Sequence, residues 1–276
     1  MEDSTPLVTF YDIAFGPPMA ETTCAPNPWK ARYALNAKAV PYKTTWVPML
    51  DISKVRLAMG VPAARKFADG SDYHTLPMIT DSSTDSIVGD SFDIAIHMQT
   101  HYADSGVKDL FPPQKLDYVF EHDLAIFAPL SGRDEGVCGD YVRFNHNVDA
   151  AFSAHVMLMA HGLPFDSVSG DDVRAEFARR AGVPTWDDLA VRGEKRGVLW
   201  GEFRETLAGL ARLFMRDCRG PFLLGEEVNF GDFIVGGWLK FMKGTLTSDE
   251  WEEARTWHDG VFGRLFDALE KYAEVH

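Results

Sequence analysis

The sequence has little cysteine and no long apolar run, and each shortage excludes a class of protein. Its three cysteines, Cys24, Cys138 and Cys218, are odd in number and widely spaced. This pattern argues against a disulfide framework and favours a reducing compartment, so we expect a cytoplasmic protein. No apolar run approaches the roughly 18 residues of a membrane-spanning helix. Residues 1–6 show neither the basic start nor the apolar stretch of a secretory signal.

Positive charge is also scarce. The 276 residues contain 27 Lys and Arg against 41 Asp and Glu, which gives a formal net charge of -14. Such a surface repels phosphate backbones and anionic lipids, so we expect neither a nucleic-acid partner nor a membrane partner. The 23 glycines form no Gly-x-Gly-x-x-Gly fingerprint or phosphate loop, which leaves nucleotide binding without support. What is present is an ordinary globular composition, 46% hydrophobic, in a chain long enough for two domains.

The first hundred residues alternate between strand and helix signals. In chain order we expect a strand, a helix, a strand, an irregular polar stretch, two strands of a hairpin and a helix, at residues 7–13, 28–38, 40–47, 51–71, 76–79, 86–88 and 90–101. This order of βαβ followed by ββα predicts an α/β fold. We therefore predict a thioredoxin-like domain over residues 1–103.

Strand signals then fade and helical ones dominate. Residues 104–113 predict a linker to an all-helical domain over 114–276. Its expected helices span residues 116–127, 148–161, 171–181, 194–215, 229–243 and 251–272. The clearest of them places four large apolar residues on one face, Phe203, Leu207, Leu210 and Phe214. Residues 131–197 are weakly patterned, which predicts a long insertion that forms a lid or shapes a pocket.

Two short motifs together suggest a receptor for an amino-acid head group. Proline inside a strand favours a strand end that exposes its neighbour's backbone, as Leu76-Pro77 would do. Fourteen residues later, Asp90-Ser91 opens an apolar helix. The Asp90 carboxylate can pair with an ammonium, while the Ser91 hydroxyl and free helical N–H groups can hold a carboxylate. A plain helix cap is the simpler interpretation of Asp90-Ser91 alone, and only the combination is specific.

A second candidate site begins near Cys24. Pro28 suits the first turn of a helix and pushes the preceding Asn27 out of helical conformation, so Asn27 is expected to cap the helix. The N–H groups of Trp29 and Lys30 would then face an anion and lower the pKa of a bound thiol. The Asn27 amide can cap and donate to sulfur at once, so both interpretations stay open. Cys24 is either a catalytic thiol or a small buried side chain.

Two further patterns have structural explanations. His97 and His101 have a zinc-compatible spacing, but no third ligand is in sight, so we expect no metal site. Asn229 and Asp232 form a variant capping box, with Val228 against Phe233 as its hydrophobic staple. This second motif is a folding device.

These motifs, taken together, resemble the glutathione S-transferase family over essentially the whole chain. Leu76-Pro77, with an expected cis bond, matches the family's backbone clamp on the cysteinyl part of glutathione. Asp90-Ser91 matches its γ-glutamyl site, and Asn229 to Asp232 its capping box. The resemblance implies glutathione as the cofactor and a homodimer as the assembly.

Within the family, the chain is most similar to the fungal and bacterial etherase-type transferases. The similarity lies in Tyr11-Asp12-Ile13, residues 26–32, Ala34-Leu-Asn36, Asp51-Ile52 and Thr75-Leu-Pro77. Such enzymes cleave β-aryl ethers of lignin-type ketones, or bind and conjugate wood-derived aromatics, so a small aromatic substrate and a detoxification role are implied. Expected glutathione-binding residues are Pro26, Trp29, Thr75, Leu76, Pro77, Asp90 and Ser91. Expected linings of the aromatic pocket are Phe15, Met19, Trp29, Tyr118, His122 and Phe127.

One departure from the family pattern affects the chemistry. Relatives have a catalytic serine just before the proline, where this chain has Ala25, and a catalytic cysteine would also stand at 25 rather than 24. Thiolate stabilisation would then fall to Asn27, the helix N-terminus and the neighbouring Thr22 or Thr23. Three functions follow as hypotheses: a glutathione-dependent β-etherase, a non-catalytic carrier of aromatic compounds, and a thiol reductase that uses Cys24.

Overall fold

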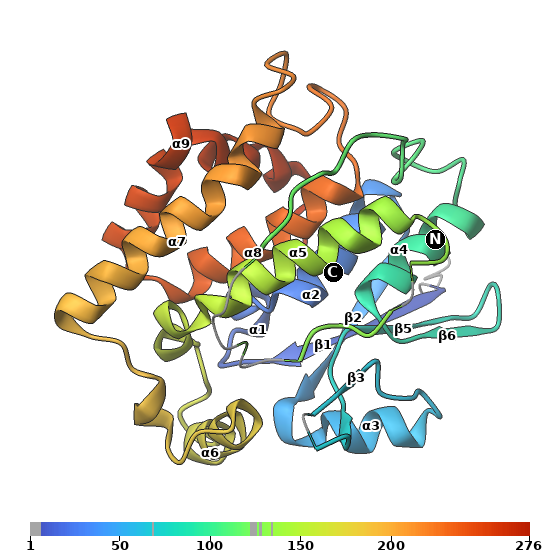
Figure 1. Ribbon diagram of the computed structural model, residues 1–276. Coiled ribbons are helices and arrows are strands. Elements are labelled where there is room, and N and C mark those ends of the chain that lie inside the picture. Colours follow the sequence, from blue (N-terminus) through green and yellow to red (C-terminus); the bar gives the residue numbers. More distant parts are fainter. Residues whose placement is uncertain (1–6, 68, 122–125, 127–128, 134) are drawn as a thin grey trace.

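The computed structural model describes residues 7–67, 69–121, 126, 129–133 and 135–276, and it combines a small sheet with a larger helical half (Figure 1). The strands are β1 (Val8–Ala14), β2 (Tyr42–Pro48), β3 (Arg65–Lys66), β4 (Asp72–Tyr73), β5 (Met78–Asp81) and β6 (Ser86–Val88). The helices are α1 (Met19–Thr22), α2 (Pro26–Ala37), α3 (Ile52–Ala58), α4 (Ser91–His101), α5 (Gly139–Ala154), α6 (Gly170–Ala181), α7 (Gly193–Phe214), α8 (Phe230–Thr245) and α9 (Ser248–Leu269).

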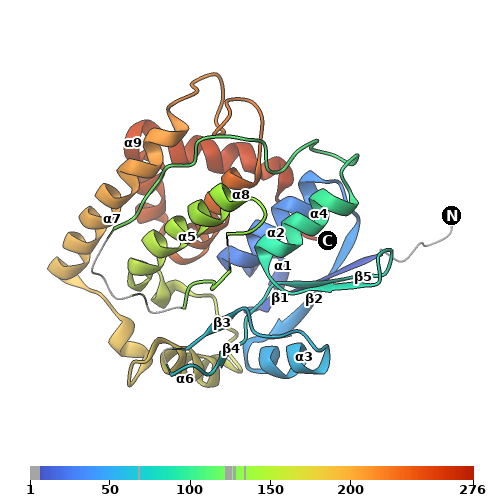
Figure 2. The same ribbon diagram turned by 45° about the vertical axis from the view of Figure 1, so that its right-hand side comes forward.

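The main sheet has the order β2-β1-β5-β6. β1 runs parallel to β2 and antiparallel to β5, and β5 and β6 form the antiparallel hairpin. α2 and α4 cover the face toward the helical half, and α3 lies on the opposite side (Figures 1 and 2). This arrangement confirms the predicted thioredoxin-like fold. The stretch 51–71, expected to be irregular, contains α3 and β3.

The two halves meet where α2 packs on α8. Two consecutive glycines of α8 allow this approach. A Cβ on Gly237 would lie 2.5 Å from the carbonyl oxygen of Pro26, and one on Gly236 would lie 3.2 Å from the Tyr33 ring. Any side chain at 237 would thus push away the first turn of α2, so the glycine fixes where that helix begins.

The C-terminal half is helical, as predicted. The four apolar residues expected on one face of α7 are all buried. The capping box of α8 is also confirmed, because the Asn229 side chain accepts from the N–H of Gly231 (2.9 Å) and Asp232 accepts from the N–H of Asn229 (2.8 Å). Burial raises the pKa of Asp232 to about 8. None of the helices in the described part of the chain is long and apolar enough to cross a bilayer.

Two predictions for this half were wrong. Of the helix expected over residues 116–127, the described residues 116–121 have no helical structure. They form an irregular segment attached to two helices. The Phe120 N–H donates to Asn147 of α5 (2.8 Å), and the Tyr118 hydroxyl donates to the Thr206 carbonyl of α7 (3.2 Å). The helix expected at residue 148 begins nine residues earlier, at Gly139, so the predicted insertion 131–197 includes a main bundle helix.

The remainder of that segment does shape a pocket. α6 stands apart from the bundle, on the side of the sheet where α3 and β3–β4 lie (Figures 1 and 2). The loop before it is tied to the first half, because the Gly16 N–H donates to the Pro164 carbonyl at 2.7 Å. The domain limits themselves, 1–103 and 114–276, stay predictions.

Candidate active site

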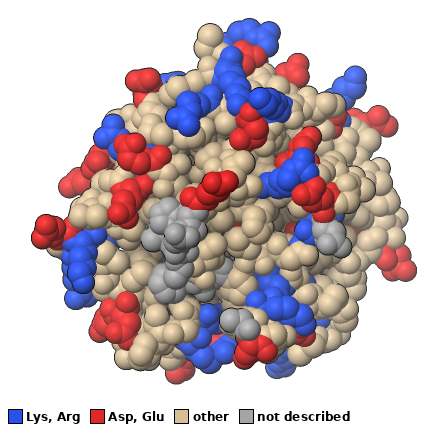
Figure 3. Space-filling view, viewed as in Figure 1, with Lys and Arg blue, Asp and Glu red and all other residues tan. Residues whose placement is uncertain are grey.

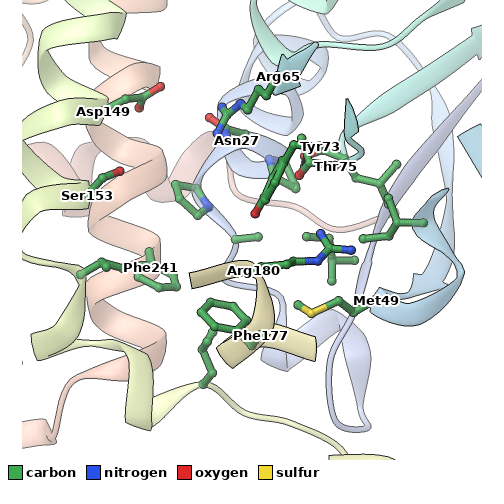
Figure 4. Close-up of a pocket in the computed structure, with 18 of the residues that line it drawn as sticks. Asn27, Met49, Arg65, Tyr73, Thr75, Asp149, Ser153, Phe177, Arg180 and Phe241 are labelled. Carbon is green, nitrogen blue, oxygen red and sulfur yellow. Dashed lines mark hydrogen bonds between the residues drawn. The ribbon is translucent and has the colours of Figure 1, made fainter. Parts of the chain in front are cut away.

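A cavity of about 150 Å³ lies between the two halves (Figure 4). The first half contributes residues from the ends of β1 and β2, the start of α2 and the segment before β5, among them Ile13, Phe15, Ala25, Pro26, Asn27, Met49, Arg65, Tyr73, Thr75 and Leu76. The helical half contributes the opposite wall from α5, α6 and α8, among them Asp149, Ser153, Leu163, Phe177, Arg180, Trp238 and Phe241. The lining is mainly apolar, with a few polar groups on both walls.

The N-terminus of α2 opens into this cavity, and its first turn has one N–H group without a hydrogen-bond partner among the described residues. The helix begins at Pro26 with Ala25 as its cap residue, so Asn27 is inside the first turn and the prediction that it caps the helix was wrong. Pro26 and Pro28 have no N–H, and the N–H of Trp29 already donates to the Ala25 carbonyl (3.2 Å). The N–H of Asn27 is therefore the donor left in this turn, rather than those of Trp29 and Lys30 as expected.

The segment before β5 also borders the cavity. The Leu76-Pro77 peptide bond is cis, as expected. Thr75 and Leu76 line the cavity, and the ladder between β1 and β5 begins only at the pair Tyr11 and Met78. The main chain at Leu76 thus stands outside the sheet, where a peptide-like ligand could pair with it.

Asp90 and Ser91 start α4 as predicted. Asp90 is the cap residue, and its Oδ1 accepts from the N–H of Phe92 at 2.8 Å. Its Oδ2 forms no hydrogen bond within the described residues, and Asp90 borders a polar hollow that shares Asp149 with the main cavity. Ser91 is buried in the first turn. A carboxylate with one free oxygen, next to a helix N-terminus, can bind both charges of an amino-acid head group.

Two arginines give the cavity a positive charge that contrasts with the acidic chain. Arg65 Nη1 donates to the Pro129 carbonyl at 3.0 Å. Arg180 donates from Nε to Glu176 (2.8 Å) and from Nη1 to the His74 carbonyl (3.2 Å). Figure 3 shows basic side chains gathered around β3 and α6. Neither residue has a signal in the sequence, because only the packing of α6 against the first half brings them together.

A buried ion pair lies directly behind the start of α2. Lys30 Nζ contacts Asp149 Oδ1 at 2.5 Å, and the Trp238 indole N–H donates to the same oxygen at 2.7 Å. Burial lowers the pKa of Lys30, and Asp149 opposes that shift. Because these residues belong to α2, α5 and α8, the pair fixes the two walls of the cavity relative to each other.

Several predicted site residues lie elsewhere. Cys24 lies away from the cavity: the residue is 1% exposed and packs against Gly244, and burial raises the pKa of its thiol. Its position gives no support to a catalytic role. Trp29 is buried too, with its indole N–H donated to the Thr23 carbonyl (2.8 Å). Tyr118 lies on α7 through its bond to Thr206, and Met19 does not line the cavity.

The other predicted contributors either lie outside the described residues or bond groups away from the cavity. His122 and Phe127 lie outside the described residues. The Thr22 hydroxyl donates to the Gly16 carbonyl (2.5 Å), and the Thr23 hydroxyl to Asp12 (3.0 Å), so both are occupied away from the cavity. His97 bonds Asp81 at 2.8 Å. Within the described residues, no cluster of three or more side chains suited to hold a metal is found.

Comparison with known proteins agrees with this geometry. A model of the glutathione S-transferase N-terminal domain matches residues 25–101, and one of the C-terminal domain matches residues 145–272. A glutathione S-transferase-like protein of Aspergillus flavus, ustS, is 25% identical over 279 residues, which cover 96% of this chain and 90% of the relative.

Solved structures extend the comparison to the whole fold. A glutathione S-transferase of Ceriporiopsis subvermispora, crystallised in complex with glutathione, is 27% identical with a TM-score of 0.79, covering 98% of this chain and 99% of that one. The glutathione transferase GSTFuA3 from Phanerochaete chrysosporium shares the fold at 22% identity and a TM-score of 0.76, over 99% and 100% of the two chains. Domain models match both halves, and the cavity lies between them at the start of α2; the chain belongs to the glutathione S-transferase family.

Proposed function

We propose that this transferase cleaves β-aryl ethers of aromatic ketones with glutathione. The thiolate attacks the carbon that bears the aryloxy group, a C–S bond forms, and the C–O bond breaks with its electron pair leaving on the phenolate. The phenolate then takes a proton from water. The observation that supports this best is an apolar cavity that reaches the N–H of Asn27 at the start of α2, which has no partner in the described part of the chain.

The proposed pose of glutathione uses three places in the first half. Its cysteinyl part pairs with the main chain at Leu76, and its γ-glutamyl head group reaches Asp90 and the N-terminus of α4. The sulfur then lies at Asn27. A helix terminus stabilises an anion by about 0.3–1 kcal/mol, and by up to about 2 kcal/mol when partly buried.

Two further groups would favour the thiolate over the thiol. The Asn27 side-chain amide lines the cavity, and Arg65 lies toward the same end of it in Figure 4. A donor and a nearby positive charge both lower the pKa of a bound thiol. They would replace the hydroxyl that Ala25 lacks.

The aromatic ketone would occupy the opposite end of the cavity. Phe15, Phe177 and Phe241 line it, and Figure 4 places Phe177 and Phe241 away from Asn27. The ketone already activates the attacked carbon, so the protein mainly positions the two reactants and excludes water from the sulfur.

One observation favours a second candidate, a carrier that binds aromatic compounds without turnover. Ala25 lines the cavity at the point where a hydroxyl is expected, and its methyl group donates no hydrogen bond. The third hypothesis, a thiol reductase, loses its support because Cys24 is buried outside the cavity. The cytoplasmic location, the homodimer and the role in the breakdown of lignin-derived compounds belong to the same proposal.

The test is release of a fluorescent phenol from a β-aryl ether ketone in the presence of glutathione. We expect release that falls about tenfold to a hundredfold in Asn27→Ala, because a hydrogen bond to a charged group is lost. Cys24→Ser is the matched control and should keep its rate within about twofold, since the thiol is outside the cavity. Tight binding of the ether without release of phenol would establish the carrier instead.

A further inference from the structure

We propose that Arg56 is a positioning residue that holds the two glutathione-binding segments in register. Arg56 is 1% exposed, and its guanidinium donates to three backbone carbonyls. Nη1 donates to Thr75 at 2.7 Å and to Gly89 at 2.9 Å, and Nη2 donates to Pro62. The first two carbonyls belong to the residues directly before Leu76 and Asp90. This inference rests on the proposed pose of glutathione.

The topology explains why one side chain can reach both segments. Thr75 precedes β5 and Gly89 follows β6, and these strands pair antiparallel with Ile79 opposite Val88. The segment that enters the hairpin and the one that leaves it therefore lie at the same end. Arg56 belongs to α3, on the other side of the sheet. Its Nη1 alone donates to both segments and so joins them.

The space around the guanidinium is closely filled. A Cβ placed on Gly89 would lie 2.3 Å from Val61 Cγ1 and 2.8 Å from Arg56 Nη2. The backbone of Gly89 does not have a positive φ, so its conformation does not require glycine. Contact with Arg56 and Val61 is what excludes a side chain there.

The charge of Arg56 needs an explanation as well. Within the described residues it forms no ion pair, although burying a cation is costly unless it is paired. Carbonyl oxygens are its hydrogen-bond partners, and the Asp90 carboxylate acts on it through space and raises its pKa against the larger lowering effect of burial. Three carbonyls from three segments match the fixed directions of the N–H groups on a planar guanidinium. The compact ammonium group of a lysine cannot reach all three in the same way.

The consequence for binding is geometric. Glutathione would contact Leu76 with its cysteinyl part and Asp90 with its γ-glutamyl part, so both contacts form together only when the segments keep their spacing. Once the first contact has formed, the second forms within the same complex, and this raises the overall affinity for glutathione. When Arg56 is lost, each segment can still bind its own part of the ligand, but the advantage of binding both is reduced.

Calorimetric titration with glutathione and with cysteinylglycine tests this directly. The dipeptide lacks the γ-glutamyl group and contacts the Leu76 segment alone. In Arg56→Lys we expect the affinity for glutathione to fall about tenfold or more, while that for cysteinylglycine changes less than about threefold. Gly89→Ala should give the same selective loss by displacing the guanidinium. In kinetics, the KM for glutathione should rise and kcat at saturation should change little.

Arg32→Lys is the matched control. Arg32 is also buried, but it bonds Asp12, Tyr42 and Thr44, none of which belongs to the two segments. Its replacement should lower the melting temperature and leave the ratio of the two affinities unchanged. An equal loss for both ligands in Arg56→Lys and Gly89→Ala, or no loss for either, overturns the positioning role. If the unaltered chain binds no glutathione, the proposed function itself fails.

Discussion

The two walls of the cavity recognise ligands in different ways. The wall from the first half mainly offers main-chain groups: the N–H of Asn27, the backbone at Leu76 and the turn that begins α4. The side chains of Asn27 and Arg65 lie beside them. The wall from the helical half uses side chains, chiefly Asp149, Ser153, Phe177 and Arg180. A backbone wall suits a constant peptide-like ligand, because substitutions alter it little. A side-chain wall can change with the second substrate.

The largest effect, on the free energy of unfolding, should come from breaking the Lys30–Asp149 ion pair that joins the two walls. Asp149→Asn would leave Lys30 buried without its carboxylate, at a cost of about 3 kcal/mol or more in the free energy of unfolding. Chemical denaturation measures it. The double variant Lys30→Met with Asp149→Leu should recover part of the loss, because it removes the unpaired charge. Equal stability of the single and double variants would contradict this role.

The next largest effect should come from low pH, because Asp81 bonds β5 to His97 of α4, the helix whose first turn belongs to the backbone wall. Burial raises the pKa of Asp81, but hydrogen bonds from His97, Ser83 and Tyr102 outweigh it and lower the pKa from 3.8 to about 2. A lowered pKa stabilises the fold above pH 4, and this contribution disappears as the pH falls from about 4 to about 2. It amounts to about 2 kcal/mol. Asp81→Asn should flatten that part of the stability curve, as followed by denaturation at each pH.

A charge change at the backbone wall should alter the chemistry. Arg65→Met removes a cation from the Asn27 end of the cavity, so the pKa of the bound thiol should rise. The rate of phenol release at pH 7 should fall about tenfold, and the loss should vanish at alkaline pH where the thiol ionises unaided. A pH–rate profile distinguishes this from misfolding. A uniform loss at every pH would show that Arg65 acts by another route.

The smallest effect should show that each wall binds a different ligand. Phe177→Ala should weaken binding of the aromatic compound about fivefold and leave glutathione affinity unaltered, because Phe177 belongs only to the helical wall. Val168→Ala, at a 91% exposed position of the same region, serves as the control. Separate titrations with each ligand give the answer. A loss of glutathione affinity in Phe177→Ala would remove the distinction between the walls.

The sequence predicted the backbone wall far better than the side-chain wall. β1, the hairpin, the cis bond at Leu76 and the cap at Asp90 depend on local patterns, and all are present. In the side-chain wall, Arg180 has no local signal, because only the packing of α6 against the first half brings it to the cavity. Arg65 of β3 belongs to the other wall, and it too has no local signal.

Local geometry explains why Trp29 and Cys24 lie away from the cavity. Successive helix residues are about 100° apart, so Trp29, two positions after Asn27, projects to nearly the opposite side of α2. There its ring packs at a tilt against that of Tyr33, with the ring centroids 5.3 Å apart. Cys24 precedes the helix, and its side chain packs against Gly244 of α8, where a Cβ on the glycine would lie 2.6 Å from that of Cys24. Neighbourhood in sequence therefore gave the correct region but not the correct side.

The two prolines that flank Asn27 also have a spectroscopic consequence. In a ¹⁵N-labelled sample, Pro26 and Pro28 give no amide signal, so among the first three residues of the helix only Asn27 gives one. Its proton chemical shift would report directly on what occupies the end of the cavity. A large downfield shift with glutathione and a small one with an S-alkylated analogue would distinguish a bound thiolate from a bound peptide.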